Sequence, residues 1–121
     1  MAKIFIAEDD KFLANAYRLK LTKAGFEVQI TGDGQELLSL LKTTTPDLII
    51  LDLIMPVKDG FATLQELRAN PEWKNIPVIV ASNLGQKEDI DKAKNLGAND
   101  FIIKSDLSLQ GVIQKITTLL K

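Results

Sequence analysis

The sequence predicts an α/β fold, a doubly wound parallel sheet of five strands with five helices on its two faces. Five short apolar runs alternate with longer segments in which apolar residues recur every three or four positions. This alternation is typical of a parallel sheet with right-handed helical crossovers. Three runs are unbroken, as expected of strands covered on both faces: 48–51, 78–81 and 101–103. The length suits a single domain over residues 1–121.

Five runs rich in Ile, Val, Leu and Phe are expected to form the strands: 3–7, 26–30, 48–51, 78–81 and 101–103. After the first strand, Leu13, Tyr17 and Leu21 recur at helical spacing. Asp10 is expected to cap the start of this first helix, because its side chain can accept from free backbone N–H groups. Gly25 is expected to end the helix, since glycine adopts the left-handed backbone that such ends require.

The remaining helices have similar start and stop signals. Asp33 is a candidate N-cap for the second helix, which has leucines on one face. The third helix is expected over about 61–69, because the residue before Pro71 disfavours helical backbone. The fourth starts near Gln86 and stops at Gly97. The strongest amphipathic pattern lies in the last helix, with Leu109, Val112, Ile113, Ile116 and Leu120 on one face.

The composition excludes several kinds of site. Fifteen Lys+Arg against sixteen Asp+Glu give a formal net charge of −1, so the chain lacks the basic excess of a protein that binds nucleic acid through phosphates. Cys and His are absent, which excludes disulfides, thiolate nucleophiles and the usual ligands of zinc and copper. A bound metal must have oxygen ligands, as Mg²⁺, Mn²⁺ and Ca²⁺ prefer. Without a membrane-spanning run or a secretory signal, a cytoplasmic protein with no membrane contact is expected.

Polar residues with complementary chemistry follow four of the five strands. Glu8 and Asp9 follow the first, Asp52 the third, Ser82 the fourth and Lys104 the fifth. The carboxyl ends of parallel strands lie at one edge of the sheet, where open α/β sheets bind ligands. Residues that follow strands are often polar in any soluble protein. This general rule does not explain why two strands end in acids while two others end in a complementary hydroxyl and amine. We therefore expect a functional site at this edge.

The electrostatics of this edge favour a divalent metal ion. Glu8, Asp9 and Asp52 repel one another, so at least one pKa is expected to rise unless a cation is present. Mg²⁺ suits the site, because it takes hard oxygen ligands and commonly bridges carboxylates to phosphate. Lys104 adds a second positive charge. A carboxylate between a metal ion and an ammonium group can act as a nucleophile toward phosphorus and form an aspartyl phosphate.

The motifs resemble the receiver domain of two-component response regulators over essentially the whole chain. They are IFIAEDD at 4–10, PDLIILDLIMP at 46–56, DG at 59–60, PVIVAS at 77–82 and FIIK at 101–104. The combination is specific, because the acidic pair, the Asp-x-x-Met-Pro-x-x-Asp-Gly motif and the lysine occur in order at the family's spacing. The resemblance implies a flavodoxin-like fold with strand order 2-1-3-4-5.

The resemblance also implies the roles of the site residues. Asp52 would be the phosphoacceptor. Glu8 and Asp9, with Asp52 and the backbone carbonyl of Ile54, would hold Mg²⁺ (or Mn²⁺). Lys104 would pair with the phosphoryl group. The phosphoryl donor would be a phosphohistidine on a sensor histidine kinase or a histidine phosphotransfer protein, and this chain, which lacks histidine, cannot be that donor.

Two further residues occupy the family's switch positions. Ser82 would hydrogen-bond a phosphoryl oxygen and move toward it, and Phe101 would turn inward with that movement; a strand aromatic is equally expected to be core alone. The fourth helix, fifth strand and fifth helix would then present an altered face to a separate downstream protein. The chain would not be an enzyme beyond catalysing its own phosphorylation and slow dephosphorylation.

Some positions are expected to be structural or depart from the family. Ser105 stands where the family usually has proline after the lysine, so a trans Lys104–Ser105 peptide is expected. Asp59 and Gly60 are expected to begin a helix rather than bind a ligand. Trp73, between two prolines, is expected to anchor a loop on the surface.

Three other readings remain to be compared. A haloacid-dehalogenase-like phosphatase needs a second Asp two residues after the nucleophile, where this chain has Ile54, and its nucleophile follows the first strand. An interaction module of receiver fold without phosphorylation is expected to lack the acceptor, the acids or the lysine. A flavodoxin-like nucleotide binder needs a Gly-rich loop after the first strand, where this chain reads Asp-Lys-Phe-Leu at 10–13.

Overall fold

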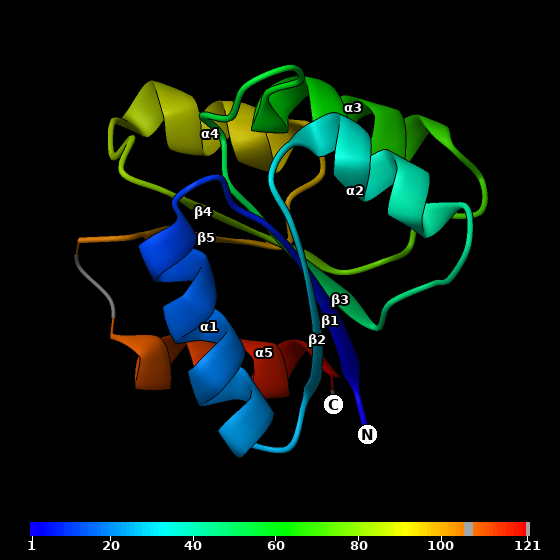
Figure 1. Ribbon diagram of the computed structural model, residues 1–121. Helices are drawn as coiled ribbons and strands as arrows, with labels where there is room; N and C mark the ends of the chain where they lie inside the picture. The colour runs from blue at the N-terminus through cyan, green and yellow to red at the C-terminus, as the bar shows by residue number, and fades with distance from the viewer. Residues whose placement is uncertain (106–107, 121) are drawn as a thin grey trace.

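The computed structural model describes residues 1–105 and 108–120, and these form a five-stranded parallel sheet between two layers of helices (Figure 1). The sheet order is β2-β1-β3-β4-β5, which confirms the predicted fold class and strand order. The strands are β1 (Lys3–Ala7), β2 (Glu27–Thr31), β3 (Leu48–Leu51), β4 (Val78–Ser82) and β5 (Asp100–Ile103). The helices are α1 (Lys11–Lys23), α2 (Gly34–Leu41), α3 (Gly60–Ala69), α4 (Lys87–Asn95) and α5 (Leu109–Leu120).

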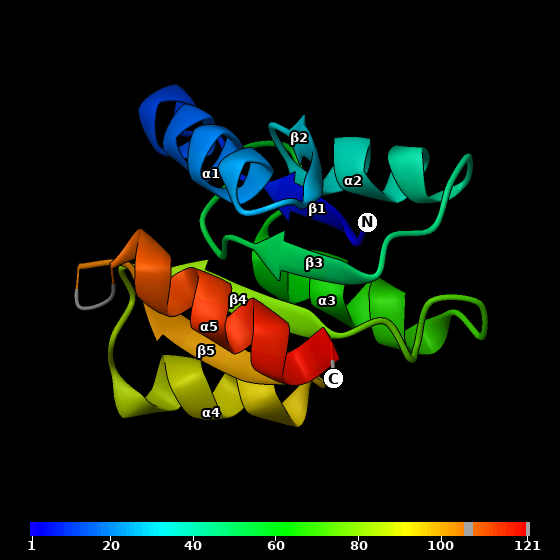
Figure 2. The ribbon, with the colours of Figure 1, turned by 90° about the horizontal axis from the view of Figure 1, so that it is seen from below.

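The helices bury both faces of the sheet. α2, α3 and α4 cover one face, and α1 and α5 cover the other (Figures 1 and 2). Successive strand residues point to opposite faces, so Phe5 joins the α2–α3–α4 core and Ile6 joins the α1–α5 core. β3 and β4 are buried along their whole length, as their unbroken apolar runs predict. β5 is less covered than expected, with only Ile102 fully buried, because it is an edge strand.

Side-chain caps fix where the first three helices begin. The carboxylate of Asp10 accepts from the backbone N–H groups of Phe12 and Leu13, at 2.9 and 3.2 Å. Asp33 and Asp59 accept in the same way at the starts of α2 and α3. The predicted caps are thus confirmed, and so is the stop at Gly25, whose φ is +98°. No helix in the described part of the chain is both long and apolar enough to cross a membrane.

Trp73 does not lie on the surface as the sequence predicts. Its side chain is buried, with 8% of the residue exposed, and it belongs to the core on the α2–α3–α4 face. The chain after α3 turns back on itself, because Trp73 N–H donates to the Asn70 carbonyl and Ile76 N–H donates to the Trp73 carbonyl. This turn points the indole inward, so the surface prediction is wrong.

Candidate functional site

Carboxylates from two strand ends meet at the carboxyl edge of the sheet. β1 and β3 are neighbours, and the backbone N–H of Asp52 donates to the Ala7 carbonyl at 3.0 Å. This contact places Asp52 beside Glu8 and Asp9, the residues that follow β1. One carboxylate oxygen from each of the three lies within 4.8 Å of the others. Such a set of hard oxygen donors can hold a divalent metal ion of the Mg²⁺ type.

Lys104, which follows the edge strand β5, also reaches this cluster. Its ammonium nitrogen lies 2.5 Å from Oε1 of Glu8 and 3.1 Å from Oδ2 of Asp52. All three side chains are largely shielded from water. The backbone N–H of Lys104 donates to the Ser82 carbonyl at 2.9 Å, which holds the lysine next to β4. The described residues contain no cis peptide bond, so the Lys104–Ser105 peptide is trans as predicted.

Burial and the charges of the cluster shift the protonation equilibria of its members. Burial raises the pKa of Glu8 to about 7; the negative charge of Asp52 adds to this rise, and hydrogen bonds from Lys104 and the Asp10 backbone oppose it. Burial would lower the pKa of Lys104, but hydrogen bonds and charges from Glu8 and Asp52 outweigh it and raise the pKa. The expected rise of a carboxyl pKa is therefore found, but its main cause is burial and not mutual repulsion.

Tyr17 is a buried neighbour of the cluster that the sequence indicates only as one of the residues at helical spacing in the first helix. Burial, together with the negative charges of Glu8 and Asp52, raises the pKa of its hydroxyl to about 12. Its ring packs with the α1–α5 core. Tyr17 therefore stays neutral near the carboxylates.

The other predicted site residues lie around the cluster without joining it in a described contact. Ser82 is buried at the end of β4, and its Oγ accepts from the backbone N–H of Leu84 at 3.2 Å. Phe101 is partly buried in β5 and packs against the core on the α4 face. Ile54 lies two residues after Asp52 with its side chain exposed. The switch roles of Ser82 and Phe101 and the ligand role of the Ile54 carbonyl stay predictions.

The loop after Asp52 is more tightly constrained than the sequence suggests. A Cβ atom on Gly60 would lie 2.2 Å from the carbonyl oxygen of Asp52, and Gly60 N–H donates to the Leu53 carbonyl at 2.8 Å. Val57 has a φ of +66°, and the N–H of Lys58 donates to the carbonyl of Pro56. These three residues form a γ-turn, whose central backbone conformation is strained for a β-branched residue. The sequence places Gly60 only at a helix start. Its position directly after an N-cap Asp does not indicate its close approach to the carbonyl oxygen of Asp52.

Comparisons with known proteins identify the family. The model of the response regulator receiver domain matches residues 4–116. The chain is 33% identical over 121 residues to the DNA-binding dual master transcriptional regulator RpaA of Synechocystis sp.. The alignment covers 100% of this chain and 50% of that protein. It resembles the receiver domain of a signal transduction histidine kinase from Syntrophus aciditrophicus, with 32% identity, a TM-score of 0.92 and coverage of 99% and 90% of the two chains.

A further solved structure is the phosphorylated cyanobacterial phytochrome response regulator RcpA, with 33% identity, a TM-score of 0.84 and coverage of 98% and 90% of the two chains. Because the family model spans almost the whole chain and the site has its acids and lysine in one cluster, the assignment rests on both sequence and geometry. The chain therefore belongs to the receiver domains of response regulators, the phosphoacceptor switches of two-component systems.

Proposed function

We propose that Asp52 is the phosphoacceptor of this receiver domain and that a phosphohistidine of a sensor histidine kinase or histidine phosphotransfer protein is its donor. The observation that carries this proposal is the cluster of Glu8, Asp9 and Asp52 with Lys104 bound against it. A carboxylate oxygen of Asp52 attacks phosphorus, the phosphorus–nitrogen bond to the donor breaks, and the imidazole takes up a proton as it leaves. The product is an acyl phosphate on Asp52.

The donor set fits Mg²⁺ or Mn²⁺, because it offers only oxygen atoms close together. Glu8, Asp9, Asp52 and the carbonyl of Ile54 would hold the ion, which would neutralise the charge of the carboxylates and the phosphoryl oxygens. Glu8 and Asp9 would hold the ion close to Asp52, whose carboxylate would act as the nucleophile. Lys104 supplies the second positive charge, so positioning and charge neutralisation account for most of the catalysis.

Phosphorylation changes what the cluster attracts. The phosphoryl group adds negative charge and strong acceptor oxygens at Asp52, which draw Lys104 away from Glu8 and attract the hydroxyl of Ser82. Ser82 ends β4 and Lys104 directly follows the neighbouring strand β5. The loops that lead to α4 and α5 therefore shift, and Phe101 turns inward. The face made by α4, β5 and α5 then contacts a downstream protein or domain in altered form. This is a population shift between two states of the domain.

The relatives indicate what such a downstream part can be. RpaA is described as a DNA-binding regulator, and this chain spans half of its length. The present chain has a net charge of −1, so we propose that the domain itself does not contact DNA. It catalyses only its own phosphorylation and slow dephosphorylation, and it is not a phosphatase with multiple turnovers.

Incubation with a small acyl phosphate donor and Mg²⁺ is expected to add the mass of one phosphoryl group to the intact protein. Asp52→Ala is expected to abolish the mass gain, because it removes the attacking oxygen, and a chelator is expected to prevent it. The control is Asp91→Ala, which removes an exposed carboxylate on α4 that pairs with Lys87. Equal phosphorylation of Asp52→Ala, or multiple-turnover hydrolysis of unrelated phosphate esters, would contradict the proposal.

Mg²⁺ is expected to raise the thermal midpoint of the protein, because an ion that binds only the folded state stabilises it. At a Mg²⁺ concentration about 100 times the dissociation constant the gain is about 2.7 kcal/mol. Asp9→Asn is expected to remove most of this gain, since Asp9 belongs to the cluster. Asp10→Asn is the matched control, because Asp10 caps α1 and asparagine caps a helix equally well. An equal loss of the Mg²⁺ effect in both variants would exclude this ligand assignment.

A further inference from the structure

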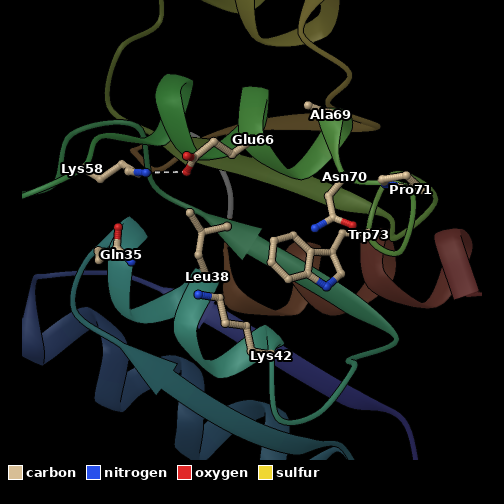
Figure 3. A pocket seen from close by; sticks show the side chains of 9 residues that line it. All are labelled: Gln35, Leu38, Lys42, Lys58, Glu66, Ala69, Asn70, Pro71 and Trp73. Atoms are coloured by element: carbon tan, nitrogen blue, oxygen red, sulfur yellow. Dashed lines mark hydrogen bonds and ion pairs between the residues drawn. The ribbon is translucent and has the colours of Figure 1, made fainter.

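A groove lies between α2, α3 and the turn after α3. It is apart from the carboxylate cluster, and α2 separates it from β2. Its volume is about 420 Å³, within the range of small-ligand and peptide sites. Figure 3 shows the side chains that line it: Gln35, Leu38, Lys42, Lys58, Glu66, Ala69, Asn70, Pro71 and Trp73. We propose that this groove docks a short acidic peptide segment of a partner protein, with one apolar side chain of the segment placed against Leu38 and Trp73.

The floor of the groove is apolar and rigid. Leu38 and Trp73 are both more than nine-tenths buried and belong to the core on this face of the sheet. They present the parts of their side chains that the core leaves uncovered, and Figure 3 shows both lining the same hollow. Ala69 and Pro71 border it with small or ring-closed side chains, which lose little conformational entropy on binding. An apolar side chain of a ligand therefore meets a preformed surface.

Hydrogen-bond donors without partners also face the groove. The indole N–H of Trp73 forms no hydrogen bond to any residue in the described part of the chain. In that part of the chain, every fully buried side-chain nitrogen or oxygen has a hydrogen-bond partner. The N–H must therefore reach solvent, and Trp73 lines this groove. Asn70 uses its Oδ1 to accept from the Glu72 N–H, which leaves its amide N–H groups free. Both N–H groups are therefore open to solvent, and each can donate to an acceptor that displaces its water.

The charges of the groove select the sign of its ligand. Lys58 pairs with Glu66 across the top of the groove, so these two charges cancel (Figure 3). Lys42, at the end of α2, forms no ion pair within residues 1–105 and 108–120, and its ammonium group is the surplus charge. One unpaired cation in a groove whose lining also offers N–H donors matches a carboxylate. A nucleic acid or a lipid surface would need several cations here, and the groove offers only one in surplus.

Trp73 is the only tryptophan of the sequence, so its fluorescence reports directly on the groove. The probe is a blocked peptide of alternating glutamate and leucine, free of tryptophan and tyrosine, at low ionic strength. Saturable change of the Trp73 emission is expected, and it is expected to weaken as salt is added. Ala69→Glu is expected to weaken binding at least tenfold, because it fills the rim and repels the peptide. Lys42→Gln is expected to weaken it about threefold, as for an exposed ion pair.

Controls separate docking in the groove from general attraction. Lys20→Gln removes an exposed lysine of α1, on the other face of the sheet, and is expected to leave the affinity unchanged. A peptide with lysine in place of glutamate, and one with serine in place of leucine, are expected not to bind. Ala69 is exposed at the end of α3, so Ala69→Glu is expected to keep the thermal midpoint. Absence of saturable binding, equal binding of the lysine peptide, or unchanged affinity of Ala69→Glu would each overturn the proposal.

Discussion

Lys104→Met is expected to lower the free energy of unfolding by about 3 kcal/mol at neutral to basic pH in the absence of divalent metal. The substitution keeps the length of the side chain but removes the ammonium group that contacts both Glu8 and Asp52. Removing one partner of a buried ion pair typically costs about 3–5 kcal/mol, because the remaining charges are left in a poor solvent. Urea unfolding with chelator present measures the loss, and Lys94→Met, an exposed lysine of α4, is the control.

The loss of stability in Lys104→Met is expected to grow as the pH rises. The pKa of Glu8 is about 7 with Lys104 beside it, against an ordinary value of 4.5, and it rises further without the ammonium group. A carboxyl whose pKa is higher in the folded state binds more protons there than in the unfolded state. Its contribution to stability is therefore present at low pH and lost as pH rises through the folded pKa. An equal loss of stability relative to the parent at about pH 8 and at about pH 5 would contradict this account.

Gly60→Ala is expected to destabilise the protein by about 3 kcal/mol, at the upper end of what an added methyl group costs in a well-packed site. The new Cβ would lie 2.2 Å from the carbonyl oxygen of Asp52 and 2.6 Å from the Cα of Leu53. Both are backbone atoms in the loop directly after β3, so neither can move aside as a flexible side chain would. The same displacement is expected to move the Asp52 carboxylate and slow its phosphorylation by a small acyl phosphate.

Gly32→Ala is the matched control for Gly60→Ala. Its Cβ would meet only Oε2 of Glu36, at an ordinary contact distance of 3.6 Å. We expect its free energy of unfolding to stay within about 0.5 kcal/mol of the parent. Equal stability of the two variants in urea unfolding would show that the loop after Asp52 yields more easily than its packing indicates.

Local signals were enough to predict the elements and the meeting of the site residues. Strand ends alone placed Glu8, Asp9, Asp52 and Lys104 at one edge, because parallel strands end on the same side. The start of β2 differs by one residue from the prediction, since Phe26 N–H donates to the Leu21 carbonyl of the preceding turn and only Glu27 bonds to Ala2 beside β1. The apolar character of Phe26 is the same in both settings.

Features that depend on the path of a loop were not predictable from the sequence. Trp73 is buried because the turn after α3 folds inward, and the prolines beside it do not encode that direction. The ion pair between Lys104 and Glu8 depends on how far a long side chain reaches across the sheet edge. Burial of Glu8, which dominates its pKa, is likewise a property of the assembled layers and not of its neighbours in sequence.

The strand order has a consequence for the newly made protein. Asp52 follows β3, Glu8 and Asp9 follow β1, and Lys104 follows β5, which is the last strand to be synthesised and the strand farthest from β1 in the sheet. A nascent chain that has not yet released β5 from the ribosome therefore has its carboxylates but no ammonium group to complete the cluster. The complete cluster of carboxylates and ammonium group therefore forms only after β5 has paired with β4.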